Sequence, residues 1–303
     1  MSAADLFATV LDCNGRRLVL DRPRVVGILN VTPDSFSDGG SHATTEAAVA
    51  HGLRLAEEGA DMLDVGGEST RPGADDVPLE EELRRVIPVI EQLAAHTSLP
   101  IAVDTSKPEV MRAAVAAGAG MINDVYALRR DGALDAAAAL RVPVCLMHML
   151  GEPRGMQDDP RYDDVVGEVH RFLTDRLFAC ELSGIDKRLV LVDPGFGFGK
   201  TLEHNLALLR ALERFGNLGS GCYVGLSRKT MIGKLTGRED PAQRAAGSVA
   251  AALIAVQRGA RMVRVHDVAA TVDALAVWQA VAAGEPAARK DPRPAAPRWP
   301  DDE

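Results

Sequence analysis

The 303-residue chain has few cysteines, and their spacing excludes the common metal and redox motifs. The four cysteines share no C-x-x-C pair and no H-E-x-x-H sequence occurs, so we expect neither a zinc site nor a thiol redox pair. Cys145 and Cys222 lie in apolar runs, where cysteine usually packs as a small hydrophobic side chain. These features predict a reducing compartment, which we take to be the cytoplasm.

Long apolar runs and an excess of positive charge are also lacking. No apolar run approaches the roughly 20 residues of a membrane helix, and Met1–Val10 contains Asp5 and no basic region, so we expect no secretory signal. The 34 Lys and Arg against 43 Asp and Glu give a formal net charge of −9. This charge argues against a nucleic-acid or anionic-membrane partner. An anionic substrate would have to be attracted by a local cluster of cations.

One stretch that is present organises the rest of the chain. The four apolar residues of Leu189–Val192 are typical of a strand buried on both faces, and they end at Asp193, before a proline and three alternating glycines. The loop lacks the first glycine of a Walker A motif, and its G-x-G-x-G spacing differs from the dinucleotide fingerprint. Taken alone, Asp193 could merely cap this loop.

The pattern of an apolar run followed by polar residues and a helical segment recurs along the chain. The expected strands are Val25–Asn30, Asp61–Gly66, Ile101–Asp104, Met121–Val125, Pro143–His148, Leu189–Asp193, Cys222–Leu226 and Met262–His266. The expected helices lie at about residues 44–58, 79–95, 108–117, 132–140, 162–183, 202–213, 240–258 and 268–283. Eight βα units over about 250 residues favour an α/β fold of the (β/α)8 TIM-barrel type over a doubly wound open sheet.

Two segments lie outside this repeat. Asn14-Gly15 is a strong turn signal, so residues 7–20 are expected to form a small N-terminal β-hairpin over one end of the barrel. We therefore predict a single barrel domain over residues 1–284. The proline-rich residues 285–303 are expected to be a disordered tail.

In a barrel, the carboxyl ends of all strands converge on one mouth, where barrel enzymes bind their ligands. Polar groups stand at these ends in Asn30, Asp104, Asn123, Asp193, Lys229, Arg264 and His266. Each of them could be structural by itself. Because buried unpaired charges cost several kcal/mol each, such a set favours a bound ligand or mutual pairing.

The strand-end groups fall into two chemical sets. Asp104, Asn123 and Asp193 suit a flat heterocycle with an amino group beside a ring N–H, because a carboxylate can accept both bonds at once. Lys229 could donate to acceptors on the ring. Met147 is expected in the pocket wall.

The second set is cationic. Arg71, Arg264 and His266 suit an anion such as a diphosphate, and Asn30 with that anion could hold a hard cation. The sequence offers no dedicated all-protein metal cage.

Long segments around these residues resemble the dihydropteroate synthase family. The similar segments are Gly27–Gly40, Asp64–Gly73, Asp104–Pro108, Ile122–Asp124, Cys145–Met149, Asp193–Lys200, Ser227–Lys229 and Arg264–Asp267. They stand in the family's order between about residues 24 and 283. The resemblance implies a (β/α)8 barrel, a homodimer, and Mg²⁺-assisted condensation of 6-hydroxymethyl-7,8-dihydropterin diphosphate with p-aminobenzoate in folate biosynthesis, where sulfonamides compete.

The resemblance also implies roles for individual residues. The implied pterin site is Asp104, Asn123, Met147, Asp193, Lys229 and Arg264. The implied diphosphate site is Asn30, Arg71, Arg264 and His266, with Asn30 on the metal. The implied p-aminobenzoate pocket is Phe36, Thr70, Pro72, Phe198 and Ser227. We expect Lys229, Asp104, Arg264 and His266 to be catalytic, and the charge layout predicts an SN1-like displacement.

Two alternatives stay open at this point. A methyltransferase-type pterin-binding barrel would share the Asp and Asn groups, but has no reason to keep Arg and His at a diphosphate site. A non-catalytic paralogue would have no reason to keep the cations Arg71, Lys229, Arg264 and His266.

Overall fold

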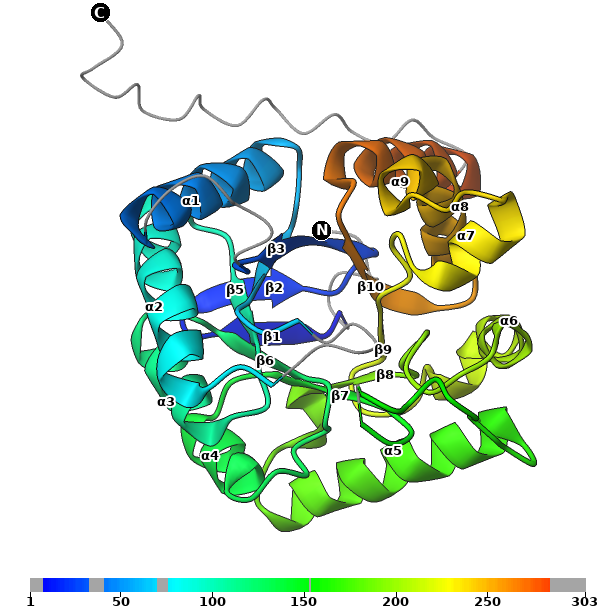
Figure 1. The fold of residues 1–303 in the computed structure, drawn as a ribbon, viewed down its shortest axis with the longest axis horizontal. Coiled ribbons are helices and arrows are strands. Elements are labelled where there is room, and N and C mark those ends of the chain that lie inside the picture. The colour runs from blue at the N-terminus through cyan, green and yellow to red at the C-terminus, as the bar shows by residue number, and fades with distance from the viewer. Residues whose placement is uncertain (1–7, 33–40, 70–75, 153, 284–303) are drawn as a thin grey trace, which may run out of the picture.

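The computed structural model describes residues 8–32, 41–69, 76–152 and 154–283. Within these ranges, eight parallel strands close into a barrel in the order β10-β3-β4-β5-β6-β7-β8-β9. The strands are β3 Arg24–Asn30, β4 Met62–Gly66, β5 Ile101–Asp104, β6 Met121–Asp124, β7 Val144–Met147, β8 Val190–Asp193, β9 Cys222–Val224 and β10 Ala260–Val265. Figure 1 shows the helices as a ring around these strands. The predicted TIM barrel is confirmed.

The helices follow the strands in alternation, close to the predicted positions. They are α1 Ser41–Glu57, α2 Leu79–His96, α3 Pro108–Ala116, α4 Ala133–Leu140, α5 Val165–Leu182, α6 Leu202–Arg210, α7 Thr230–Thr236, α8 Ala245–Gln257 and α9 Val268–Ala283. The short helix α7 was not predicted. The segment predicted as one helix over 240–258 is a 3-10 turn, Pro241–Arg244, followed by α8.

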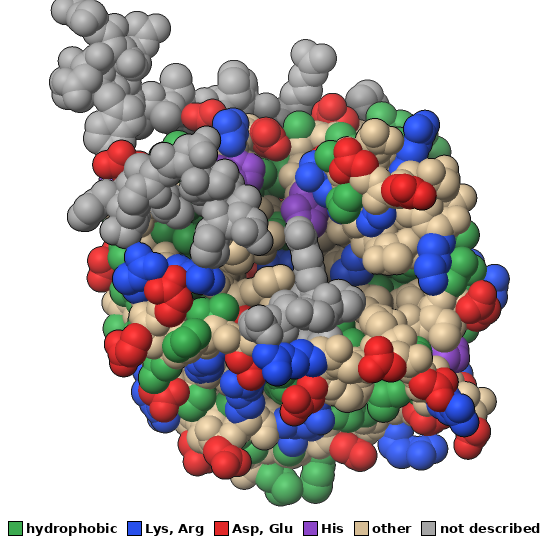
Figure 2. Space-filling model, viewed as in Figure 1, with side chains coloured by type: hydrophobic (Ala, Val, Ile, Leu, Met, Phe, Trp, Pro, Cys, Tyr) green, Lys and Arg blue, Asp and Glu red, His purple; other side chains and the backbone are tan. Residues whose placement is uncertain are grey.

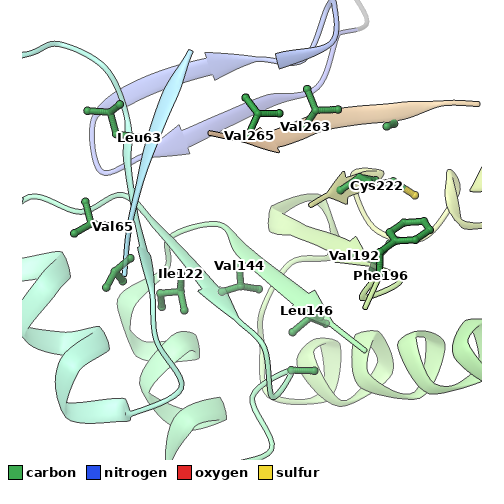
Figure 3. Close-up of a cluster of buried hydrophobic side chains, with 14 of the residues drawn as sticks. Leu63, Val65, Ile122, Val144, Leu146, Val192, Phe196, Cys222, Val263 and Val265 are labelled. Carbon is green, nitrogen blue, oxygen red and sulfur yellow. The ribbon is translucent and has the colours of Figure 1, made fainter. Parts of the chain in front are cut away.

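Alternate residues of the barrel strands point to opposite sides, and the outward ones form the main core with the helices. On β4, Leu63 and Val65 pack in this outer layer, whereas Met62 belongs to the cluster in the barrel interior. Figure 3 shows part of the outer layer, including Ile122 and Val144. Since both faces of each strand are buried, the strands appear in the sequence as apolar runs.

The predicted hairpin is present, as β1 (Val10–Cys13) paired antiparallel with β2 (Arg16–Val19). Asn14 and Gly15 both have positive φ, 56° and 80°, as a type I′ turn requires. Its apolar side chains share one buried cluster with the barrel interior: Leu11, Cys13, Leu18, Leu20, Val26, Met62, Ala102, Met121, Cys145, Leu191, Tyr223 and Met262. These interior residues lie near the start or middle of their strands, so the hairpin closes the end of the barrel opposite the mouth.

The proline-rich segment predicted as a tail lies outside the described residues, so its disorder stays a prediction. Among the described helices, none combines the length and apolar character that crossing a bilayer requires.

Candidate active site

Strand alternation places mostly polar residues at the inward positions that end the strands. Counted in steps of two from the interior cluster, these positions are Asn30, Gly66, Asp104, Asn123, Met147, Asp193 and Arg264. The strand register makes several of them neighbours, since Asp104 pairs with both Gly66 and Asn123, and Met147 pairs with Asp193. The structure therefore brings the predicted strand-end residues together at one mouth.

Arg264 joins two carboxylates at this mouth. Its Nε lies 2.5 Å from Asp64 Oδ2, and its Nη2 lies 2.8 Å from Asp104 Oδ2. Asp64 Oδ2 also accepts bonds from Asn123 Nδ2 at 3.0 Å and from the Tyr223 hydroxyl at 3.2 Å. Among the described residues, Asp64 Oδ1 is a buried oxygen with no hydrogen-bond partner. A ligand with an N–H group at this point would complete the hydrogen bonding of Asp64.

The cluster shifts the titration of its members. Burial raises the pKa of Asp104 to about 7, against the pull of Arg264, and the nearby carboxylate of Asp64 adds to the rise. The two carboxylates raise the pKa of Arg264 above its ordinary value although burial opposes this. Arg264 is therefore a permanent cation, whereas Asp104 titrates near neutral pH.

Asp193 and Lys229 form a second pair of opposite charge. Asp193 Oδ1 accepts the backbone N–H of Gly195 at 2.7 Å. Gly195 has φ 72°, and a Cβ there would overlap the carbonyl oxygen of His148, so the loop needs glycine at this point. Burial raises the pKa of Asp193, while the positive charge of Lys229 opposes this rise. Burial likewise lowers the pKa of Lys229 to about 8, although Asp193 attracts its proton.

Lys229 is held against the loop that follows β8. Its Nζ donates to the carbonyl oxygen of Phe196 and lies 4.5 Å from the centroid of the Phe198 ring. Phe198 also packs on a small buried cluster that includes Met147 of the neighbouring strand β7. The Lys229 ammonium therefore lies over the Phe198 ring and interacts electrostatically with the carboxylate of Asp193.

Lys200 holds the loop that follows β8 through its side-chain ammonium. Its buried ammonium has three acceptors in reach: His148 Nδ1 at 2.9 Å, the Phe198 carbonyl at 2.9 Å and the His148 carbonyl at 3.3 Å. Burial lowers the pKa of Lys200 well below its usual value, although the negative charge of Asp193 opposes this shift. The contact ties Phe198 to the end of β7.

Ser227 and His266 meet where the loops after β9 and β10 lie side by side. The Ser227 hydroxyl oxygen accepts the backbone N–H of His266 at 3.1 Å and lies 3.0 Å from its Nδ1. Figure 2 shows acidic and basic side chains interspersed over this face of the molecule, with blue and purple side chains near its centre. The local cations that an anionic substrate needs are thus present in a chain of net charge −9.

Comparisons with known proteins agree with this geometry. The family described as "Pterin binding enzyme" matches residues 26–266. The chain is 52% identical over 270 residues to the dihydropteroate synthase of Escherichia coli K12, covering 89% of this chain and 95% of that protein. This chain belongs to the dihydropteroate synthase family.

Solved structures support the same membership of the dihydropteroate synthase family. A Xanthomonas albilineans dihydropteroate synthase with 4-aminobenzoic acid is 71% identical, with a TM-score of 0.87, covering 91% of this chain and 99% of that one. The same organism's enzyme in complex with 7,8-dihydropteroate is 68% identical, with a TM-score of 0.83, covering 90% and 99%. The resemblance inferred from the sequence is confirmed.

Several predicted site residues of this dihydropteroate synthase family member lie outside the described ranges. They are Phe36, Thr70, Arg71 and Pro72. Most of the predicted p-aminobenzoate pocket and one diphosphate ligand are therefore not placed, and their roles stay predictions. The roles assigned to the placed residues stay predictions as well, since proximity at the mouth does not by itself assign a substrate group.

The sequence interpretation missed Asp64 as a site residue. Its signal was an acid in the middle of the strand Met62–Gly66, at an inward position, where an apolar residue is the rule. Asp124, by contrast, faces away from the mouth and accepts the backbone N–H groups of Tyr126 and Leu128. It caps the loop after β6.

Proposed function

We propose that this chain condenses 6-hydroxymethyl-7,8-dihydropterin diphosphate with p-aminobenzoate to give 7,8-dihydropteroate and diphosphate, a step of folate biosynthesis. The observation that carries the proposal is a row of carboxylate and amide groups beside the cations Arg264 and Lys229. In this row Asp64, Asn123 and Asp193 are buried and Asp104 is 11% exposed. Similarity to the Xanthomonas albilineans enzyme with 7,8-dihydropteroate supports it.

The pterin ring fits the acidic side of the mouth. Asp193 has one oxygen committed to Gly195, which leaves Oδ2 for an amino group or ring N–H of the pterin. Asp104 and Asn123 offer further polar groups along the same rim, and Lys229 can donate to a ring acceptor. Arg264 would lie over the ring, where a guanidinium stacks well. Met147 lines the apolar wall.

The diphosphate fits the cationic side of the mouth. Arg264 and His266 lie there at the carboxyl end of β10, and Arg71 is expected there as well. Mg²⁺ would supply positive charge to this leaving group. The donor set fits this ion, because a hard cation prefers oxygen ligands such as the amide oxygen of Asn30 at the end of β3. Asn30 would provide one amide oxygen while the diphosphate and water provide the rest.

The p-aminobenzoate pocket is proposed at Phe36, Thr70, Pro72, Phe198 and Ser227. Phe198 offers a face for the aryl ring, beside Lys229. Ser227 offers a hydroxyl just before the start of α7, and sulfonamides would compete for the same space. Assembly as a homodimer in the cytoplasm completes the proposal.

The reaction proposed is a dissociative displacement. Negative charge grows on the diphosphate as the C–O bond breaks, and Arg264, His266 and Arg71 stabilise it. Positive charge spreads into the electron-rich pterin, next to the carboxylates of Asp104 and Asp193. The aryl amine then attacks the methylene carbon and loses its proton, and no enzyme nucleophile is needed.

One calorimetric experiment with a product assay tests the function. The chain is titrated with pterin diphosphate and Mg²⁺, then given p-aminobenzoate, and dihydropteroate is measured. Binding followed by product supports the proposal. Binding of pterin without any product would favour a methyltransferase-type barrel or a non-catalytic paralogue, and absence of both binding and product would reject a pterin enzyme altogether.

A further inference from the structure

Arg228 lies between two proposed site residues, Ser227 and Lys229, and has an unusual backbone. Its φ is 57°, in the left-handed region that side chains other than glycine, Asn and Asp rarely adopt. This conformation costs on the order of 1 kcal/mol or more. The contacts of Arg228 must therefore hold it in place.

The guanidinium of Arg228 binds Asp267 with two parallel bonds. Nη2 lies 2.6 Å from Asp267 Oδ1, and Nε lies 3.1 Å from Oδ2. This is the fork geometry that makes Arg-carboxylate pairs both strong and directional. Both side chains are partly buried, with exposed fractions of 32% and 16%, so solvent screens the pair only in part.

The backbone of Arg228 is held as well, from the side of α8. Its N–H donates to Ser248 Oγ at 2.8 Å, and its carbonyl oxygen accepts a bond from Arg244 Nη1 at 2.9 Å. Ser248 Oγ in turn donates to the Arg244 carbonyl at 2.6 Å. The side chain and both peptide groups of Arg228 are thus fixed by three other residues.

Asp267 follows His266 directly, so the ion pair joins the two loops that carry Ser227-Lys229 and His266. In the barrel, Val224 of β9 pairs with Val263 of β10, a separation of 39 residues. Ser227 and His266 have the same separation and are hydrogen-bonded, and so do Arg228 and Asp267. The 39-residue offset between the two paired strands is therefore kept in the loops that follow them, where side-chain contacts replace the backbone pairing.

We propose that the Arg228–Asp267 pair is a positioning device: it sets Lys229 and His266 at the mouth without touching substrate. The Ser227–His266 hydrogen bond and the Arg228–Asp267 ion pair are two successive contacts that hold the two loops together. This inference rests on the proposed function, in which Lys229 and His266 act on the pterin diphosphate. A displacement of these groups by a fraction of an ångström would weaken charge stabilisation of the transition state more than substrate binding.

A double-mutant cycle tests the pair. Arg228→Gly keeps the positive φ without strain and removes the guanidinium, and Asp267→Asn removes the charge with little change in size. Each single variant is expected to lower kcat by roughly tenfold to a hundredfold with little change in KM. The double variant should lose no more than the worse single one, because the two groups act as a unit. Losses that multiply, or an unchanged kcat, would overturn the proposal.

A matched control and a second readout separate this inference from the proposed function. Arg188→Gly removes a bidentate partner of Asp186 at the amino end of β8, and it should leave kcat unchanged. The imidazole NMR signals of His266 report its placement without turnover, and they should shift in Arg228→Gly but not in the control Arg188→Gly. If the wild-type chain made no dihydropteroate while these signals shifted, the function would be wrong and the positioning right. Unshifted signals with an active wild-type chain would refute the positioning.

Discussion

Arg264 and Asp104 come from strands that are not neighbours, yet Nη2 and Oδ2 lie 2.8 Å apart across the barrel mouth. Two other strands, β3 and β4, separate β10 from β5 in the barrel. Arg264 also binds Asp64, so one guanidinium serves two carboxyl groups. Because Arg264 is shared, its positive charge offsets only part of the cost of burying the ionised Asp104. The pKa of Asp104 therefore rises to about 7.

Asp104 should therefore make stability depend on pH. The folded chain binds a proton at Asp104 below about pH 7, whereas an ordinary aspartate binds one only near 3.8. Because the folded state holds the extra proton, this contribution is fully present below about pH 4 and is lost as pH rises through about 7. Asp104→Asn cannot titrate, so its melting temperature should rise relative to that of the wild-type chain between about pH 4 and about pH 7.

The difference between the two melting curves isolates Asp104, because Asp124 and Asp193, whose pKa values are also raised, titrate in both proteins. Asn retains an oxygen for Arg264, so the ion-pair geometry has a substitute. Two curves that stay parallel over this pH range would show that Asp104 does not titrate there.

Asp193→Asn should weaken pterin binding while the fold survives. The Asn oxygen can still accept the backbone N–H of Gly195, so the loop keeps its internal bond. The variant loses the negative charge and places an N–H₂ group toward the pterin. We expect a loss on the order of 3 kcal/mol or more in pterin affinity, measured by calorimetry. Asp186→Asn, at an exposed carboxylate far from the mouth, serves as control, and an unchanged affinity in folded Asp193→Asn would remove Asp193 from the site.

Lys229→Gln should affect turnover far more than stability. The Gln amide can still donate to the Phe196 carbonyl, but the cation beside Asp193 is gone. Loss of a preorganised charge typically costs about 10² in rate, and burying this cation does not favour folding, so the melting temperature should change little. Lys234→Gln on the exposed side of α7 is the matched control. Full activity together with a large drop in melting temperature would make Lys229 a structural residue.

Gly120→Ala should destabilise the hairpin end of the barrel. A Cβ on Gly120 would overlap the backbone carbonyl of Cys13, which cannot move aside as a flexible side chain could. Overpacking of this kind costs about 1–3 kcal/mol, measurable by urea unfolding. Gly155→Ala meets only ordinary contacts and should be nearly neutral. Equal midpoints for the two variants would mean that the hairpin does not pack as tightly as the structure has it.

The sequence was enough to predict the strands, each to within two residues at either end. Parallel strands buried on both faces appear as apolar runs, and each run here stops where polar residues begin. Helix α7 was missed because it has only seven residues, with Gly233 inside it. So short a segment shows no helical periodicity.

The site was predictable where it stands at strand ends and not where it depends on distant partners. Asp104 and Asp193 could be placed at the mouth because each ends a run. The role of Asp64 depends on Arg264, 200 residues away in the chain, and on Tyr223. Such contacts follow from barrel closure, which local patterns do not encode.

The mechanism makes its own prediction. In the proposed mechanism, Arg264 and His266 would stabilise the departing diphosphate, and the carboxylates of Asp104 and Asp193 would stabilise the pterin cation, so charge separation is favoured on both sides. If the C–O bond breaks before the amine arrives, pterin diphosphate carrying ¹⁸O in the bridge should scramble its label. We expect ¹⁸O in non-bridging positions after incubation with enzyme and Mg²⁺ but without p-aminobenzoate, measured by ³¹P NMR.

A secondary deuterium isotope effect at the methylene is a second test of the dissociative step. It is needed because slow rotation of the diphosphate within the site could hide the scrambling of the label. In a dissociative step the methylene carbon becomes trigonal before it bonds the amine, so its C–H bending modes loosen and the deuterated substrate should react distinctly more slowly. In a concerted displacement the entering amine compensates for this loosening. The measurement is made under conditions where chemistry limits the rate, with Lys229→Gln as the slow reference. An isotope effect close to unity under these conditions would contradict the dissociative mechanism, whatever the labelling result.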